Sequence, residues 1–174
     1  MKTRLFALLV VATLPLMAFN CVTDSFTISL NLKPFNGTYP ITPGPNKTYG
    51  GIYVVSPDSM YDSNTFTLDG ASVYDIRIQT VGPDLGAVAG DVYVNGTLLL
   101  HYAGTWTQFN TPQSLLSSPY ITRNSPGINV LIQAVVSSNQ PITFTLAGSE
   151  TVSPVPAGCS IIGSAYIQAY GHKK

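Results

Sequence analysis

The chain carries very little charge. Only 9% of its 174 residues are Asp, Glu, Lys or Arg, against about 25% in an ordinary soluble domain. Eight basic residues balance eight acidic ones, so no basic excess is available to hold a phosphate backbone. The composition therefore predicts no nucleic-acid partner, and a surface made polar by Ser, Thr, Asn and Gln.

Strong helix formers and the usual catalytic motifs are also scarce. Glutamate occurs once, at Glu150, whereas β-branched and aromatic residues abound. The sequence has no Gly-x-Ser-x-Gly elbow, no His/Cys/Glu spacing typical of zinc sites, and no glycine loop that would cradle phosphate ahead of a helix. These absences predict a strand-rich protein that uses no cofactor and is not an enzyme.

Long apolar runs are missing after the first residues, so we expect no transmembrane helix in the rest of the chain. At the start, Lys2 and Arg4 precede an apolar run from Leu5 to Phe19. A charged start, an apolar run too short for a stable span and a polar boundary are typical of an export signal. Residues 1–21 are therefore predicted to be a signal peptide, and residues 22–174 the domain that acts outside the cytoplasm.

The end of this segment, Met17-Ala18-Phe19-Asn20-Cys21, resembles the lipobox of bacterial lipoproteins. The resemblance covers only the first twenty-one residues and names no activity. It implies that Cys21 carries several acyl chains and holds the protein at the cell envelope, the only membrane contact we expect. Phe19 and Asn20 depart from the small residues that the lipobox has before its cysteine.

Cleavage after Ala18 is the alternative, and it would leave the protein secreted or periplasmic. Cys21 could then form a disulfide with Cys159 in an oxidising compartment. A sulfur committed to a lipid thioether cannot enter a disulfide, so the two outcomes exclude each other. In a third outcome both thiols stay unpaired.

Apolar and polar residues alternate with a period of two through most of the chain, most clearly from Phe26 to Leu32. Eight or nine such segments are separated by Gly, Pro and Asn turn signals at regular spacing. This pattern predicts an all-β fold: a single antiparallel β-sandwich or jelly-roll-like domain with one short helix. The first and last strands are expected to be neighbours.

Two turns are specific enough to predict register. Asn95-Gly96 lies between two apolar runs and indicates a type I′ hairpin turn, because both residues tolerate positive φ. Counting outward from this turn places Val92 opposite Leu99. Asp69-Gly70 indicates a second hairpin turn, between strands over 65–68 and 72–81.

The short helix is expected to begin near Thr111, which can cap it, and Pro112, which suits the first helical position. It should end before Pro119. The segment from Thr105 to Phe109 is expected to be another strand. The apolar run from Ile128 to Val136 is expected to be another strand.

Four aromatic residues are candidates for ligand binding: Trp106, Tyr102, Phe109 and Tyr120. Exposed aromatic rings with polar neighbours stack on sugar rings or anchor a protein partner. The alternative, which the usual placement of aromatic residues favours, is that these rings fill the core.

Asp58, Asp62 and Asp69 lie in the most oxygen-rich part of the chain. Hard cations need several carboxylate, carbonyl and amide oxygens converging on one point, so these residues are the candidate metal ligands. Their spacing matches no EF-hand, and Asp is also an ordinary turn former. A plain surface loop is the favoured alternative.

Hydrolysis would need a base, and His101 is the candidate. Asp75 and Asp91 are the acids that could approach each other in space, as glycoside hydrolysis requires. A structural role for His101 is favoured because no nucleophile motif accompanies it.

Together these observations predict a non-catalytic exported protein, held at the cell envelope or secreted, with a structural or binding role and a carbohydrate or protein partner. One alternative is a subunit of a surface oligomer, suggested by the hairpin over 91–100, whose two faces are both apolar. A second alternative is an extracellular hydrolase that uses Asp75, Asp91 and His101.

Overall fold

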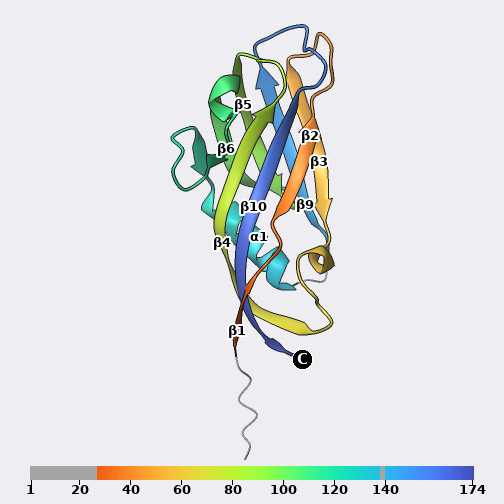
Figure 1. Ribbon diagram of the computed structural model, residues 1–174, viewed down its shortest axis with the longest axis vertical. Helices are drawn as coiled ribbons and strands as arrows, with labels where there is room; N and C mark the ends of the chain where they lie inside the picture. The colour runs from red at the N-terminus through yellow and green to blue at the C-terminus, as the bar shows by residue number, and fades with distance from the viewer. Residues whose placement is uncertain (1–26, 138–139) are drawn as a thin grey trace, which may run out of the picture.

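The computed structural model describes residues 27–137 and 140–174 of the chain, so residues 1–21, with the predicted signal and Cys21, lie outside the described residues. Within these described residues, ten strands, one α-helix and two short 3-10 helices follow one another (Figure 1). The strands are β1 Ile28–Asn31, β2 Phe35–Pro40, β3 Thr48–Val55, β4 Phe66–Val81, β5 Ala87–Val94, β6 Thr97–Thr105, β7 Gln113–Ser114, β8 Ile121–Arg123, β9 Ile142–Glu150 and β10 Ser160–Lys173.

Two antiparallel sheets make up the sandwich. One has the order β1-β10-β4-β7, with β2 also pairing with β10 beyond the end of β1; the other has the order β3-β9-β5-β6-β8. The connections from β2 to β3, from β4 to β5 and from β9 to β10 each cross between the sheets, so early and late strands interleave. This is the arrangement of a jelly roll, and it confirms the predicted all-β sandwich, including the pairing of the first strand with the last.

The predicted Asn95-Gly96 turn is confirmed. Asn95 has a φ of 46° and Gly96 a φ of 80°, which a type I′ turn requires. The Asn95 side chain also accepts a hydrogen bond of 2.9 Å from the Thr143 backbone N–H, which ties the turn to the start of β9. The register prediction was wrong beyond Tyr93, because a bulge shifts Val92 from Leu99 to Leu100.

The predicted turn at Asp69-Gly70 was wrong. β4 runs without interruption from Phe66 to Val81, along the whole of β10. Gly70 is needed for space and not for a turn, since a Cβ at this position would overlap the ring of Tyr170 on β10. A glycine that admits a neighbouring ring and one that permits a turn look the same in a sequence.

The helix lies elsewhere than predicted. α1 spans Ser125–Ser137 and takes up the apolar run that was predicted to be a strand. Asn124 caps it by accepting a hydrogen bond of 3.2 Å from the Gly127 N–H. Leu131 and Val135, one turn apart, face inward and are buried. No helix within the described ranges has both the length and the hydropathy of a membrane span.

The segment predicted as a helix from Thr111 is mostly loop, and its Gln113–Ser114 portion forms β7 on the edge of β4. Trp106–Phe109, predicted to be strand, is a 3-10 helix. Thr105 caps it, because its hydroxyl accepts from the Gln108 N–H while the Gln108 side chain accepts from the Thr105 N–H. This reciprocal capping box favours a helical turn over an extended one.

α1 contacts β4 of one sheet and β6 of the other, in the lower half of the molecule as Figure 1 shows it. The core between the sheets is apolar and contains a small cavity of about 30 Å³. Gly163 of β10 lines this void, and a Cβ at this position would meet only Tyr39, at an ordinary 3.8 Å.

One acid lies inside the sandwich. Glu150 ends β9 with 4% of its surface exposed, and neither carboxylate oxygen has a hydrogen-bond partner among the described residues. Loss of hydration raises the pKa of Glu150. Burial raises the pKa of Tyr49 on β3, of Tyr102 on β6 and of the Cys159 thiol, and the nearby Glu150 carboxyl adds a smaller contribution in the same direction.

We expect Gly163→Ala to stabilise the protein by about 0.5–1 kcal/mol, because it restricts the unfolded chain and fills part of the void. Gly171→Ala in the same strand is the matched control, since its Cβ would overlap the backbone carbonyl of Thr67. The control should be destabilising. Urea unfolding measures both, and a destabilising Gly163→Ala would contradict the expectation.

Glu150 should make the protein less stable as pH rises. Because its folded pKa is raised, the native state binds more protons than the unfolded state between the unfolded pKa, near 4.5, and the raised folded one. Stability is greatest below this window and falls through it. Glu150→Gln should flatten this dependence and raise the free energy of unfolding at pH 7 by about 1–3 kcal/mol.

Urea unfolding from pH 4 to pH 8 measures the stability of wild type and of Glu150→Gln. Asp58→Asn, which removes an exposed carboxylate, is the control. Parallel curves for wild type and Glu150→Gln would show that the buried carboxyl does not govern the pH dependence.

Candidate functional site

Three of the four candidate aromatic residues lie in the core. Trp106, Tyr102 and Phe109 have no exposed surface, and Tyr120 is half-buried beside them. The Tyr102 and Phe109 rings meet edge to face with centroids 5.7 Å apart, a favourable aromatic geometry. A sugar ring cannot reach these faces in the folded protein, so of the two roles left open by the sequence, burial supports core packing.

The polar atoms of this cluster are satisfied within the protein. The Trp106 indole N–H donates to the Gly82 carbonyl at 3.2 Å, and the Tyr102 hydroxyl lies 2.7 Å from that of Tyr49. Burial raises the pKa of Tyr102 far above its ordinary value. Each group therefore has an internal partner, as buried polar groups require, and none is left for a ligand.

The candidate metal ligands do not converge. Asp58 accepts from the Ser63 hydroxyl, Asp62 from Asn64 and Thr65, and Asp69 lies 3.0 Å from the His172 ring. The hydrogen bond from Thr65 is the main cause of the lowered pKa of Asp62. The described part of the chain holds no cluster of three His, Cys, Asp or Glu that could bind a metal. Asp58 and Asp62 stabilise their own loop, as turn-forming aspartates do.

The candidate hydrolytic residues are divided between the two sheets. Asp91 of β5 and His101 of β6 are opposite each other and 2.8 Å apart. Asp75 lies in β4, in the other sheet, so the two aspartates do not form a pair. Within the described residues no hydroxyl or thiol is hydrogen-bonded to His101. The Asp91–His101 pair therefore links two neighbouring strands.

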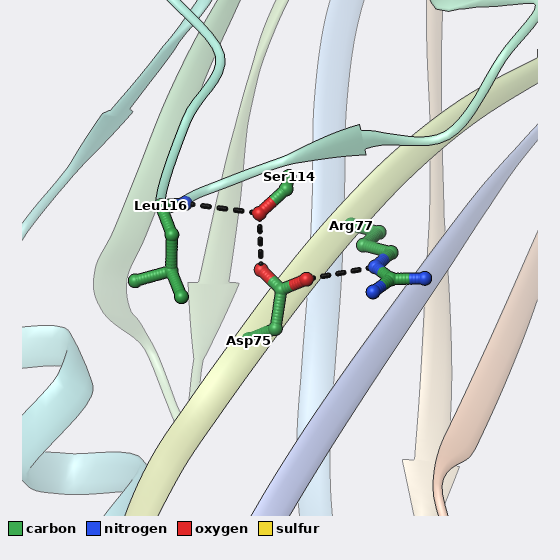
Figure 2. Close-up of polar contacts among 4 residues, drawn as sticks. All are labelled: Asp75, Arg77, Ser114 and Leu116. Carbon is green, nitrogen blue, oxygen red and sulfur yellow. Dashed lines mark hydrogen bonds and ion pairs between the residues drawn. The ribbon is translucent and has the colours of Figure 1, made fainter.

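Asp75 belongs to a polar cluster that the sequence did not reveal (Figure 2). Its carboxylate accepts from the Arg77 Nε and from the Ser114 hydroxyl, both at 2.7 Å, and the Ser114 Oγ accepts from the Leu116 N–H at 3.1 Å. The hydrogen bond to Asp75 raises the pKa of Arg77. The guanidinium also lies over the ring of Tyr166, 4.8 Å from its centroid.

Asp75 is 3% exposed, so its two hydrogen bonds replace the water that its charge has lost. Ser114 reaches it only because β7 pairs with β4 at Arg77. The sequence alone does not predict this contact, since 39 residues separate Asp75 from Ser114. The cluster fastens β7 to the sheet and holds Tyr166 in place.

Cys159 is buried at the start of β10, and its thiol lies 3.6 Å from the Pro83 carbonyl. Burial raises the pKa of the thiol, which lowers its reactivity as a nucleophile. Cys21, its predicted disulfide partner, lies outside the described residues, so both the lipid anchor and the disulfide remain predictions.

β3 is an edge strand with unusual exposure. It pairs with β9 along all eight residues, and no described strand pairs with its other side. Ile52 is 69% exposed and Val54 54% exposed on the outer face. On the same outer face, the cross-strand neighbours of Ile52 are Thr145 on β9 and, one strand farther, Tyr93 on β5. The neighbour of Val54 is Thr143 on β9.

The predicted hairpin over 91–100 is not at an edge: β5 and β6 each have a partner strand on both sides. Its apolar character is explained by burial, because Val92, Val94, Leu99 and Leu100 all belong to the core. The exposed apolar surface of this sheet is therefore on β3, where the sequence analysis did not place it.

No protein-family model and no curated protein matches the chain. Among solved structures, the chain is similar to one titled as turnip yellow mosaic virus at 100 K, with 14% identity, a TM-score of 0.39, and coverage of 87% of this chain and 96% of that one. It is also similar to the decameric BFDV capsid protein, with 9% identity, a TM-score of 0.34, and coverage of 86% and 99%.

Proposed function

We propose that the protein is a non-catalytic structural subunit that associates with a second copy of itself through the free edge of β3. The single observation that carries this proposal is an eight-residue edge strand without charge or proline, whose outer edge pairs with no other strand of the described residues. The setting we propose is outside the cytoplasm, because residues 1–21 have the pattern of an export signal.

Natural edge strands are blunted by lysines, prolines, bulges or a covering element, because their free N–H and C=O groups invite another strand. β3 has the sequence Thr-Tyr-Gly-Gly-Ile-Tyr-Val-Val, which contains neither a charge nor a proline. Its register with β9 shows no shift. An edge strand that is regular in register and carries no charge is expected to have a partner.

The chemistry around β3 favours an identical partner. The outer face beside it carries Thr143, Thr145 and Tyr93, which are uncharged, and Asp91, farther along the sheet, is in contact with the His101 ring at 2.8 Å. A neutral face offers no charge for an acidic or basic partner to recognise. An antiparallel strand can pair with its own copy about a two-fold axis, which would join the two sheets into one.

The inner side of β3 is already occupied. The Tyr39 ring of β2 lies against Gly51, and the Tyr53 ring packs against Gly37 of β2. Burial raises the pKa of Tyr39 to about 12. These tyrosines hold β3 against the facing sheet, so that the strand edge is presented without reorganisation, which lowers the entropic cost of association.

We expect the protein to form dimers whose population rises with concentration, and the variant Ile52→Lys with Val54→Lys to weaken the dimer by about tenfold or more, since edge lysines oppose strand pairing. Sedimentation velocity over a range of concentrations measures this. Leu116→Lys is the matched control: Leu116 is 64% exposed and follows β7 in the other sheet.

The control should dimerise like wild type, and circular dichroism should show that all three proteins fold. A wild-type protein that stays monomeric at the highest concentration, or a double variant with unchanged association, would contradict the proposal.

A further inference from the structure

A hollow lies on the other sheet, where β4 and β10 change register. The shift between Tyr166 and Ile167 leaves Tyr74 of β4 as an extra residue in the ladder. Because β1 ends at Asn31 and β2 begins at Phe35, the sheet edge is also interrupted here. The hollow is lined by Asn31, Leu32, Pro34, Tyr74, Tyr166, Ile167 and Gln168.

Tyr74 is the most unexpected of these residues, because it is a large aromatic side chain that is 67% exposed. Among the described residues it makes no side-chain hydrogen bond. The fold does not need its ring, since a bulged residue contributes little to the ladder. Exposed aromatic rings next to a hollow are characteristic of binding surfaces.

Tyr166, on the other wall, is held in a fixed orientation. The Arg77 guanidinium lies 4.8 Å from its ring centroid, and Arg77 is itself held by Asp75, which Ser114 also binds (Figure 2). An aromatic wall that is already ordered loses little entropy when a ligand stacks on it. The polar cluster of Asp75, Arg77 and Ser114 therefore orders one wall of the hollow, because it fixes the ring of Tyr166.

Two amides complete the lining. Asn31 and Gln168 are opposite each other on β1 and β10, and both are exposed. The Gln168 amide nitrogen donates to the Ser29 hydroxyl at 3.1 Å, which orients the side chain. This leaves the Gln168 carbonyl oxygen as an acceptor and the whole Asn31 amide as both donor and acceptor.

No described residue that lines the hollow is charged. Arg77 and Asp75 nearby are paired with each other, and Lys33, between the lining residues Leu32 and Pro34, lines a different hollow together with Asp58 and Asp62. The lining itself therefore offers no charge to attract an anion or a cation. Aromatic walls suit the apolar face of a sugar ring, and amides suit its hydroxyls, which both donate and accept hydrogen bonds. We propose that this hollow binds a neutral sugar residue of a glycan, with Tyr74 as the stacking ring.

The test is a titration followed by NMR of the full protein with four neutral hexasaccharides: cellohexaose, maltohexaose, chitohexaose and mannohexaose. We expect at least one of them to bind and to shift the signals of Tyr74, Tyr166 and Gln168. Tyr74→Ala should weaken that binding by about tenfold, the loss of one stacked ring, whereas Tyr74→Phe should retain it. Thermal unfolding should be unchanged in both variants, because the ring is exposed.

Tyr170→Ala is the matched control, because Tyr170 is 51% exposed on the same β10 but does not line the hollow. It should bind like wild type. A sulfated oligosaccharide and a tyrosine-rich peptide serve as competing ligand classes. Absence of binding to all four neutral glycans, binding unaffected by Tyr74→Ala, or preferred binding of the sulfated glycan or the peptide would each overturn the proposal.

Discussion

The pairing of β4 with β10 is the constraint on which the rest of the structure depends. β10 is bonded to β4 along its length and to β1 and β2 on its other side. One face of this pair supplies core residues such as Ile76, Ile78 and Ile161. The same pair, through one change of register, projects Tyr74 outward and creates the hollow. Core and candidate binding surface are thus two faces of one ladder.

The scarcity of charge has a clear structural consequence. Several acidic side chains of the strands have a polar partner close by: Asp75 is paired with Arg77, while Asp91 and Asp69 lie within 3.0 Å of the His101 and His172 rings. Large areas of both outer faces are left neutral, and recognition must then rest on shape, aromatic contact and neutral hydrogen bonds. Such interactions are short-range and nearly independent of salt. Glu150 is the exception, as a buried carboxyl without a hydrogen-bond partner.

The strands and the Asn95-Gly96 turn could be predicted because both are local properties: alternation follows from the pleat, and the turn from the φ angles that asparagine and glycine tolerate. The helix could not. Residues 128–136 are mostly apolar, interrupted only by Asn129 and Gln133, and a short segment of this composition is found both in buried strands and in buried helices. Two contacts favour the helix: the cap formed by Asn124 and the close approach of Gly127 to the β6 backbone. The approach of Gly127 joins residues that are far apart in the sequence.

For the candidate sites, too, local properties could be predicted from the sequence and properties that depend on the fold could not. The sequence by itself determined that this protein would be a neutral, strand-rich sandwich, because composition and period two are summed over the whole chain. It also singled out aromatic residues, but not which ones are exposed. Only the tertiary structure decided that Trp106 is enclosed, that Tyr74 stands out at a bulge, and that β3 lies at an edge. The physical reason is that exposure and edge position depend on which strands become neighbours, and that depends on contacts between residues far apart in the chain.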